Sequence, residues 1–78
     1  MEKISPSLYR LVKSEPEKKY PVLIVVKNGT DIATLPLQNP RHLMEDIASA
    51  TLTGNEVLRL SKLKEIESIE LDEEAHIL

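Results

Sequence analysis

The sequence predicts an α+β domain with a ferredoxin-like β-α-β-β-α-β order, in which a four-stranded antiparallel sheet carries its helices on one face. Three observations support this prediction. Residues 22–26 form a continuous β-branched run typical of a central strand. Thr53 and Glu56 have the spacing of a capping box, which opens a helix. Residues 67–72 alternate apolar and acidic side chains, as a strand does.

Residues 1–19 are expected to form a short helix followed by a charged connector. Ser5-Pro6 is typical of a helix start, because serine can cap the helix and proline suits its first position. Leu8, Leu11 and Val12 follow at helical spacing until Glu15-Pro16. We therefore divide the chain into an N-terminal part (1–19), a folded unit (20–72) and an extended tail (73–78).

Within the folded unit, residues 22–26 are predicted to be buried on both faces of the sheet and to end at the turn Asn28-Gly29. Thr30-Asp31 can cap a helix of a turn or two. Residues 40–47 fit a helix locally, whereas the alternation from Ala48 to Thr53 fits a strand. We interpret 41–53 as a short hairpin. After the capping box, one helical stripe is expected to be buried: Val57, Leu60 and Leu63.

Composition argues against several functions. The net charge of -3, with two Tyr and no Phe or Trp, leaves neither a basic surface nor stacking platforms for nucleic acid. The longest apolar run is too short to span a membrane. No secretory signal is recognisable, so we expect a cytoplasmic protein if the chain is free-standing, or a secreted one if it is cut from a longer precursor.

The chain carries no recognisable catalytic or metal-binding motif. It has no Cys, no Gly-x-Ser-x-Gly turn and only two Gly, and His42 and His76 lie far apart without partner ligands. We therefore expect no enzyme activity, cofactor or metal. Six of the thirteen acids fall between Glu65 and Glu74. Of these, Glu70 and Asp72 are expected to project from one face of a strand about 6.5 to 7 Å apart, either solvated or in contact with a partner.

Several segments together resemble the propeptide, or inhibitor, domains of subtilisin-like serine proteases. The segments are Ile47-Ala-Ser-Ala-Thr-Leu-Thr53, the helix 55–64, Ile66-Glu-Ser-Ile-Glu-Leu-Asp72 and Ala75-His-Ile-Leu78, in the family's order and close to its spacing. Tyr20-Pro-Val-Leu-Ile-Val-Val26 resembles the family's first strand. Residues 29–46 depart from the pattern, because they lack the longer first helix and the Gly-Gly before the second strand.

This resemblance implies a role for each matched residue. Glu70 and Asp72 would cap the N-termini of two protease helices, and the small polar residues Ser49, Thr51 and Thr53 would let those helices approach the sheet. The tail residues Ala75, His76, Ile77 and Leu78 would fill subsites S4 to S1 as an added strand. The chain would inhibit the protease and assist its folding, being a monomer when free and a heterodimer with the protease.

A second interpretation remains open. The chain could instead be a small ferredoxin-like regulatory or interaction domain that uses its open sheet face, including for self-association. Such a domain would have no need of residues 73–78.

Overall fold

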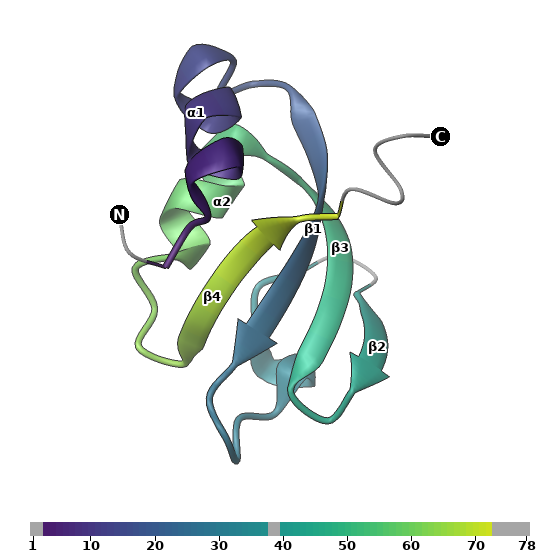
Figure 1. Cartoon of the computed structure of the whole chain (residues 1–78). Coiled ribbons are helices and arrows are strands. Elements are labelled where there is room, and N and C mark those ends of the chain that lie inside the picture. Colours follow the sequence, from purple (N-terminus) through teal and green to yellow (C-terminus); the bar gives the residue numbers. More distant parts are fainter. Residues whose placement is uncertain (1–2, 38–39, 73–78) are drawn as a thin grey trace.

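The computed structural model describes residues 3–37 and 40–72, which form an α+β globule of two helices and a four-stranded antiparallel sheet (Figure 1). The strand order is β2-β3-β1-β4. The elements in chain order are α1 (Pro6–Ser14), β1 (Lys19–Val26), the 3-10 turn η1 (Ile32–Thr34), β2 (Arg41–Met44), β3 (Ile47–Thr53), α2 (Gly54–Leu60) and β4 (Ile66–Leu71).

Both helices pack on the same face of the sheet and close a single core. Each helix turns an apolar stripe to the strands, as the helical spacing of the sequence predicts. The two stripes meet alternate residues of β1 and β3, and Ile66 and Ile69 of β4. The fully or almost fully buried side chains at the centre of this core are Leu8, Val12, Val22, Ile24, Ala48, Val57, Leu60, Ile66 and Ile69.

The connection between β1 and β2 differs from the ferredoxin-like expectation. It contains only the single turn η1, and the second helix of the layer is α1, which precedes β1. Asp31 caps this turn as predicted, since its side chain accepts a hydrogen bond from the backbone N–H of Ala33. Pro36 and Pro40 limit any longer helix here, because proline lacks an N–H and clashes with the preceding turn. Ile32 and Leu35 cover the end of the core instead.

The prediction that residues 22–26 are buried on both faces is wrong. Burial alternates strictly along β1, so that Val22, Ile24 and Val26 are buried while Leu23 and Val25 are only half-buried. A sheet with helices on one side covers only one face of its central strands. The apolar residues on the other face of β1 remain partly open to solvent.

The N-terminus adds a contact that the sequence did not indicate. Ser5 occupies the predicted N-cap position before Pro6, but its side chain makes no capping hydrogen bond. Instead, the backbone N–H of Ser5 donates to Ile69 O, and that of Ile69 donates to Lys3 O, at 3.0 and 2.7 Å. Residues 3–5 therefore lie parallel to β4 and cover part of its outer edge.

The start of α2 is built as predicted. The Thr53 hydroxyl accepts a hydrogen bond from Glu56 N, and the Glu56 carboxylate accepts one from Thr53 N. The next residue, Gly54, lets the helix approach the α1–β1 connector closely, because a Cβ at this position would lie 2.8 Å from Pro16 Cα. Its N–H donates to Lys18 O. The helix ends at Leu60, and Leu63, predicted to be buried, is half-buried in the turns that follow.

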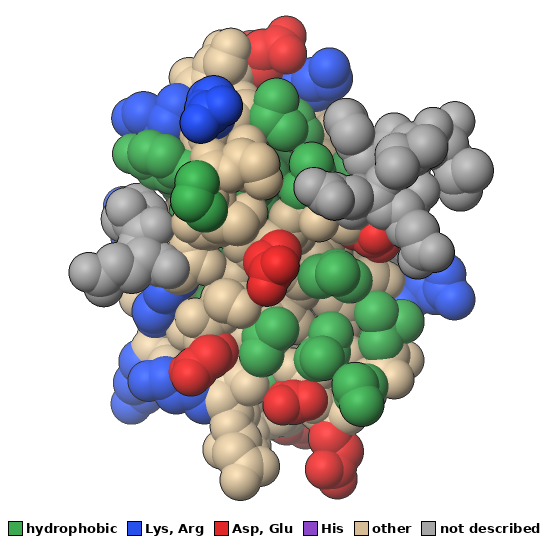
Figure 2. Space-filling model, in the orientation of Figure 1, with side chains coloured by type: hydrophobic (Ala, Val, Ile, Leu, Met, Phe, Trp, Pro, Cys, Tyr) green, Lys and Arg blue, Asp and Glu red, His purple; other side chains and the backbone are tan. Residues whose placement is uncertain are grey.

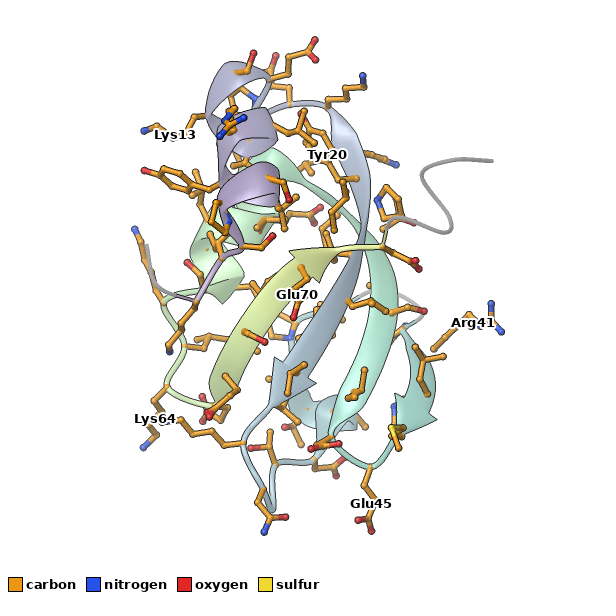
Figure 3. The ribbon with its side chains drawn as sticks, in the orientation of Figure 1. Lys13, Tyr20, Arg41, Glu45, Lys64 and Glu70 are labelled. Atoms are coloured by element: carbon orange, nitrogen blue, oxygen red, sulfur yellow. The ribbon has the colours of Figure 1, made fainter. Side chains whose placement is uncertain are left out.

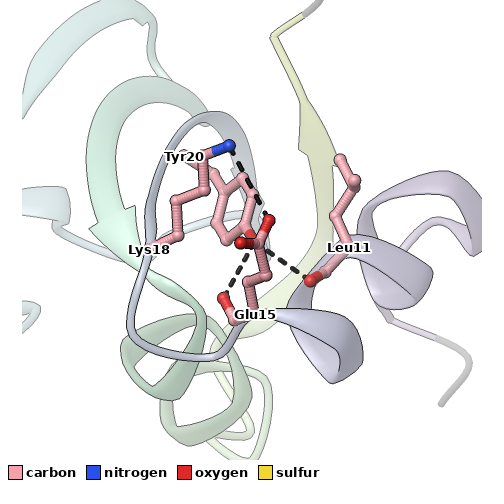
Figure 4. A network of polar contacts seen from close by, with 4 residues as sticks. All are labelled: Leu11, Glu15, Lys18 and Tyr20. Atoms are coloured by element: carbon pink, nitrogen blue, oxygen red, sulfur yellow. Dashed lines mark hydrogen bonds and ion pairs between the residues drawn. The ribbon is translucent and has the colours of Figure 1, made fainter.

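Tyr20 joins the end of α1 to the start of β1 (Figure 4). Its ring is buried, and its hydroxyl lies 3.0 Å from Leu11 O and 2.8 Å from Glu15 O at the C-terminal end of the helix. Leu11 O also accepts from Glu15 N, and Glu15 O from Lys18 N, so the Tyr20 hydroxyl adds a second hydrogen bond to each carbonyl at the helix terminus. The nearby pair Lys18–Glu15 is exposed and contributes little.

Candidate docking face

The face of the sheet opposite the helices, which we call the open face, carries an apolar centre with polar and charged margins. The strand register aligns three rows across it. One row runs Arg41, Ser49, Leu23, Glu70; the next runs Met44, Ile47, Val25, Ser68; and the third joins Thr51 to Pro21, with Asp72 beside Pro21. All of these residues are half-buried or exposed.

Hydrophobic side chains visibly gather on this face. Figure 2 shows them over β1 and β3 in the lower half of the view, with acidic side chains at their margins. Leu23, Val25 and Ile47 are half-buried, and Met44 at the end of β2 is 63% exposed. Such a patch, apolar at its centre and polar at its rim, is typical of a surface that binds a partner.

Of the predicted site residues, the structure brings Ser49, Thr51, Glu70 and Asp72 to the open face. Glu70 is exposed and lies directly opposite Leu23 of β1. Figure 3 shows the labelled Glu70 side chain over the sheet. Asp72 follows β4; its N–H donates to Pro21 O, which continues the pairing by one residue. Asp72 also has an interaction within the chain.

The remaining predicted residues stand apart from this group. Thr53 lies at the end of β3, where its hydroxyl is engaged in the capping box. Ala75, His76, Ile77 and Leu78 lie outside the described residues. The sequence therefore predicted one part of the face and a tail whose placement the structure does not describe.

The apolar centre of the open face was missed. Residues 22–26 were interpreted as buried on both sides, which hid Leu23 and Val25, and Arg41 was placed in a hairpin without a role. The signal that could have found them is the pairing of β1 with β3. Ser49 and Thr51 stand at alternate positions of β3, which indicates a face that no helix covers, and the residues of β1 beside them lie on that same face.

Hollows also lie elsewhere on the described part of the molecule. One, of about 210 Å³, lies between α2 and the segment after η1, and its lining is mostly apolar: Pro36, Leu37, Leu52, Glu56, Arg59, Leu60 and Leu63. Another, of about 340 Å³ and mostly polar, lies between two loops and is lined by residues 28–31 and by Glu45 and Asp46. Among the residues that the structure describes, no cluster of His, Asp and Glu could hold a metal ion.

Among the described residues, the carboxylate of Glu56 has a shifted pKa, and it lies on the helix side of the sheet. The backbone hydrogen bond from Thr53 lowers the pKa of Glu56 below its ordinary value of 4.5, and the Thr53 hydroxyl and the nearby Arg59 and Lys19 act in the same direction. This is the electrostatic signature of a capping box. The role of Glu56 is therefore structural.

Comparisons with known proteins bring no assignment, since no protein-family model, curated protein or solved structure matches the chain. Within the described part of the chain, no helix is long and apolar enough to cross a membrane. A functional interpretation must therefore start from the open face.

Proposed function

We propose that the chain inhibits a subtilisin-like serine protease, docking through its open face and inserting residues 73–78 into the active-site cleft as a product would. One observation carries the proposal: Glu70 and Asp72 lie at the margin of an open apolar face, immediately before this tail. The resemblance of 47–78 to propeptide domains supplies the class of partner.

The open face suits a partner that presents helices end-on. Free N–H groups and the helix dipole make a helix N-terminus favourable for a carboxylate. Glu70 and Asp72 are two residues apart on one face, so each can meet a different helix N-terminus. Ser49 and Thr51 are small, so a helix can approach the strand that carries them.

The proposal includes a ferredoxin-like relationship for the fold. The antiparallel order β2-β3-β1-β4 is the order expected of that fold, and α2 connects β3 to β4 as its second helix would. In this view, η1 stands in place of the first crossover helix, and α1 takes over part of the missing layer. The short turn agrees with the departure from the family pattern at residues 29–46.

For inhibition, the cleft has to return more free energy than fixing residues 73–78 within it costs. Ordering an extended residue costs about 1 to 2 kcal/mol of backbone entropy, which a cleft can offset through strand-like hydrogen bonds and apolar burial. Under this proposal Ala75, His76, Ile77 and Leu78 occupy subsites S4 to S1, with Leu78 making the S1 contact.

The test of the docking face is inhibition of peptide hydrolysis by a panel of subtilisins. Glu70→Ala should weaken inhibition by about 0.3 to 2 kcal/mol, the range for a charge at a helix N-terminus, while leaving the fold intact. Asp72→Ala should act in the same direction, although its interaction within the chain makes it a less clean probe. Glu17→Ala, in the exposed connector after α1, is the matched control. If Glu70→Ala and Asp72→Ala both inhibit as strongly as Glu17→Ala does, the two carboxylates do not cap helices of the protease.

The test of the tail compares the full chain with a form that lacks residues 75–78 and with Leu78→Asp. Both variants should keep the circular dichroism spectrum of the parent and lose most of their inhibition, because a charge in an apolar S1 pocket is costly. A truncated form that inhibits as well as the parent would favour the regulatory-domain interpretation. So would a parent that inhibits no member of the panel.

The same interface would also assist folding of the protease. A ligand that binds only the folded form stabilises that form by mass action. The chain should therefore raise the yield of active protease on refolding from denaturant, measured after the inhibitor is removed. The variant Glu70→Ala should raise that yield less than Glu17→Ala does.

A further inference from the structure

We propose that the open face also binds a second copy of the chain, forming a weak face-to-face dimer with its two-fold axis parallel to the strands. This inference does not depend on the proposed function. It rests on how the charges of the open face are ordered across the sheet.

The row Arg41, Ser49, Leu23, Glu70 has opposite charges at its two ends. Arg41 and Glu70 are both exposed, and three strand spacings separate them, about 14 Å at the usual 4.7 to 4.9 Å per strand. Figure 3 shows Arg41 at the outer edge beside β2 and Glu70 over β4, on the other side of β1 and β3. The middle of the row carries Leu23.

A two-fold axis parallel to the strands, midway between β3 and β1, reverses this row onto itself. Arg41 then lies over Glu70 of the second copy, and Glu70 over Arg41 of the second copy, so each dimer contains the pair twice. In the neighbouring row, Ile47 lies over Val25 of the second copy. The charged ends of the first row meet opposite charges, whereas Leu23 lies over Ser49, and Met44 over Ser68, of the second copy.

The other way to stack the two faces is disfavoured by the same row. A two-fold axis perpendicular to the strands, running along the row, places Arg41 over Arg41 and Glu70 over Glu70 of the second copy. Like charges placed directly opposite each other are destabilising. Of these two arrangements, the charge order therefore favours the axis parallel to the strands, which keeps the strands nearly aligned as in packed antiparallel sheets.

The dimer is expected to be weak. The open face belongs to a sheet of only four strands, so the surface area that it can bury is expected to be smaller than that of a standard stable interface. The net charge of -3 adds little repulsion between copies at moderate salt. We therefore expect a monomer at low protein concentration and a dimer at high concentration. The expectation that the free chain is a monomer would then hold only in dilute solution.

The experiment is sedimentation equilibrium over a concentration series, with charge reversals at the two ends of the row. Arg41→Glu and Glu70→Arg should each weaken the dimer about tenfold, since each breaks both copies of the pair and replaces attraction with repulsion. The double variant Arg41→Glu with Glu70→Arg should restore the affinity of the parent to within about threefold, because it re-forms the pair with the charges exchanged.

Two control variants match the changes in net charge away from the open face. Lys13→Glu, on α1, matches Arg41→Glu, and Glu17→Lys, in the connector, matches Glu70→Arg; both should dimerise like the parent. Circular dichroism checks that each variant is folded. A parent that stays monomeric throughout the series would overturn the proposal. So would single reversals that dimerise like the parent, or a double variant no better than the single ones.

The dimer and the proposed inhibitor can fail separately. The sedimentation series uses no protease, so it tests self-association whether or not inhibition is found. If both hold, the two uses compete for one face, and a cognate protease should dissociate the dimer. The variant Arg41→Glu would then dimerise more weakly than the parent and still carry the carboxylates of the docking face.

Discussion

The two faces of the sheet are made from the same four strands, yet they differ in almost every property. On the helix side, Val22, Ile24 and Ile69 are fully buried and contact the apolar stripes of α1 and α2. On the open side, Leu23 and Val25 are half-buried among Ser, Thr and Glu. The helix side thus holds the core that stabilises the fold, and the open side holds the residues that we propose for recognition.

The largest expected difference between the faces lies at neighbouring residues of β1. Ile24→Ala should lower the free energy of unfolding by about 2 to 5 kcal/mol, because it removes buried methyl groups and leaves a cavity. Leu23→Ala should cost only about 0.5 to 1.5 kcal/mol, since less of that side chain leaves water. Urea denaturation followed by circular dichroism measures both.

A domain this small has limited stability, so Ile24→Ala can unfold it outright. Ile24→Val, expected to cost about 0.5 to 1.5 kcal/mol, keeps the measurement possible. Equal costs for Ile24→Val and for Leu23→Ile would contradict the difference between the faces.

The second prediction concerns the junction that holds the helix layer in place. Gly54→Ala should destabilise the domain by about 1 to 3 kcal/mol, because the new Cβ meets the backbone of Pro16, which no flexible side chain can relieve. Gly29→Ala is the contrasting variant. Its backbone has a positive φ of 89°, but nothing lies within 4 Å of an added Cβ, so its cost comes from backbone strain alone. Thermal unfolding of both variants distinguishes packing from strain.

How much of the difference between the two faces could be predicted from the sequence depends on whether the sequence pattern is local. The capping box at Thr53, the hairpin and the last strand are local patterns, and they were predicted within a few residues. The alternation of Glu70 and Asp72 with Ile69 and Leu71 was equally local, which is why these carboxylates were placed on one face correctly.

The remaining features depend on contacts between distant segments. The pairing of residues 3–5 with Ile69 and the half-exposure of Leu23 both follow from which element covers which part of the sheet. A continuous apolar run looks the same in the sequence whether helices cover one face of the strand or both. Both helices pack on one face of the sheet, and this packing leaves Leu23 and Val25 on the other face of β1 partly open.

The third prediction tests the point where the chain passes from β3 to the helix side. Thr53→Ala should cost about 0.5 to 2 kcal/mol, because it removes the hydroxyl that accepts from Glu56 N at the start of α2. Thr51→Ala, two residues earlier on the open face, removes an exposed hydroxyl and should change the stability by less than about 0.5 kcal/mol. Urea denaturation of this pair sharpens the comparison, and a larger loss for Thr51→Ala would reverse it.

The smallest expected effect is a pH dependence at the start of α2. The lowered pKa of Glu56 means that its ionised carboxylate is favoured in the folded state, so its contribution to stability is fully present above about pH 4.5 and is lost as the pH falls through the folded pKa. Glu56→Gln should therefore reduce the loss of stability on acidification below that value, relative to the parent. Urea denaturation of the parent and the variant at a series of pH values measures this difference. If Glu56→Gln loses stability on acidification as steeply as the parent does, the ionised carboxylate does not stabilise the fold through the capping box.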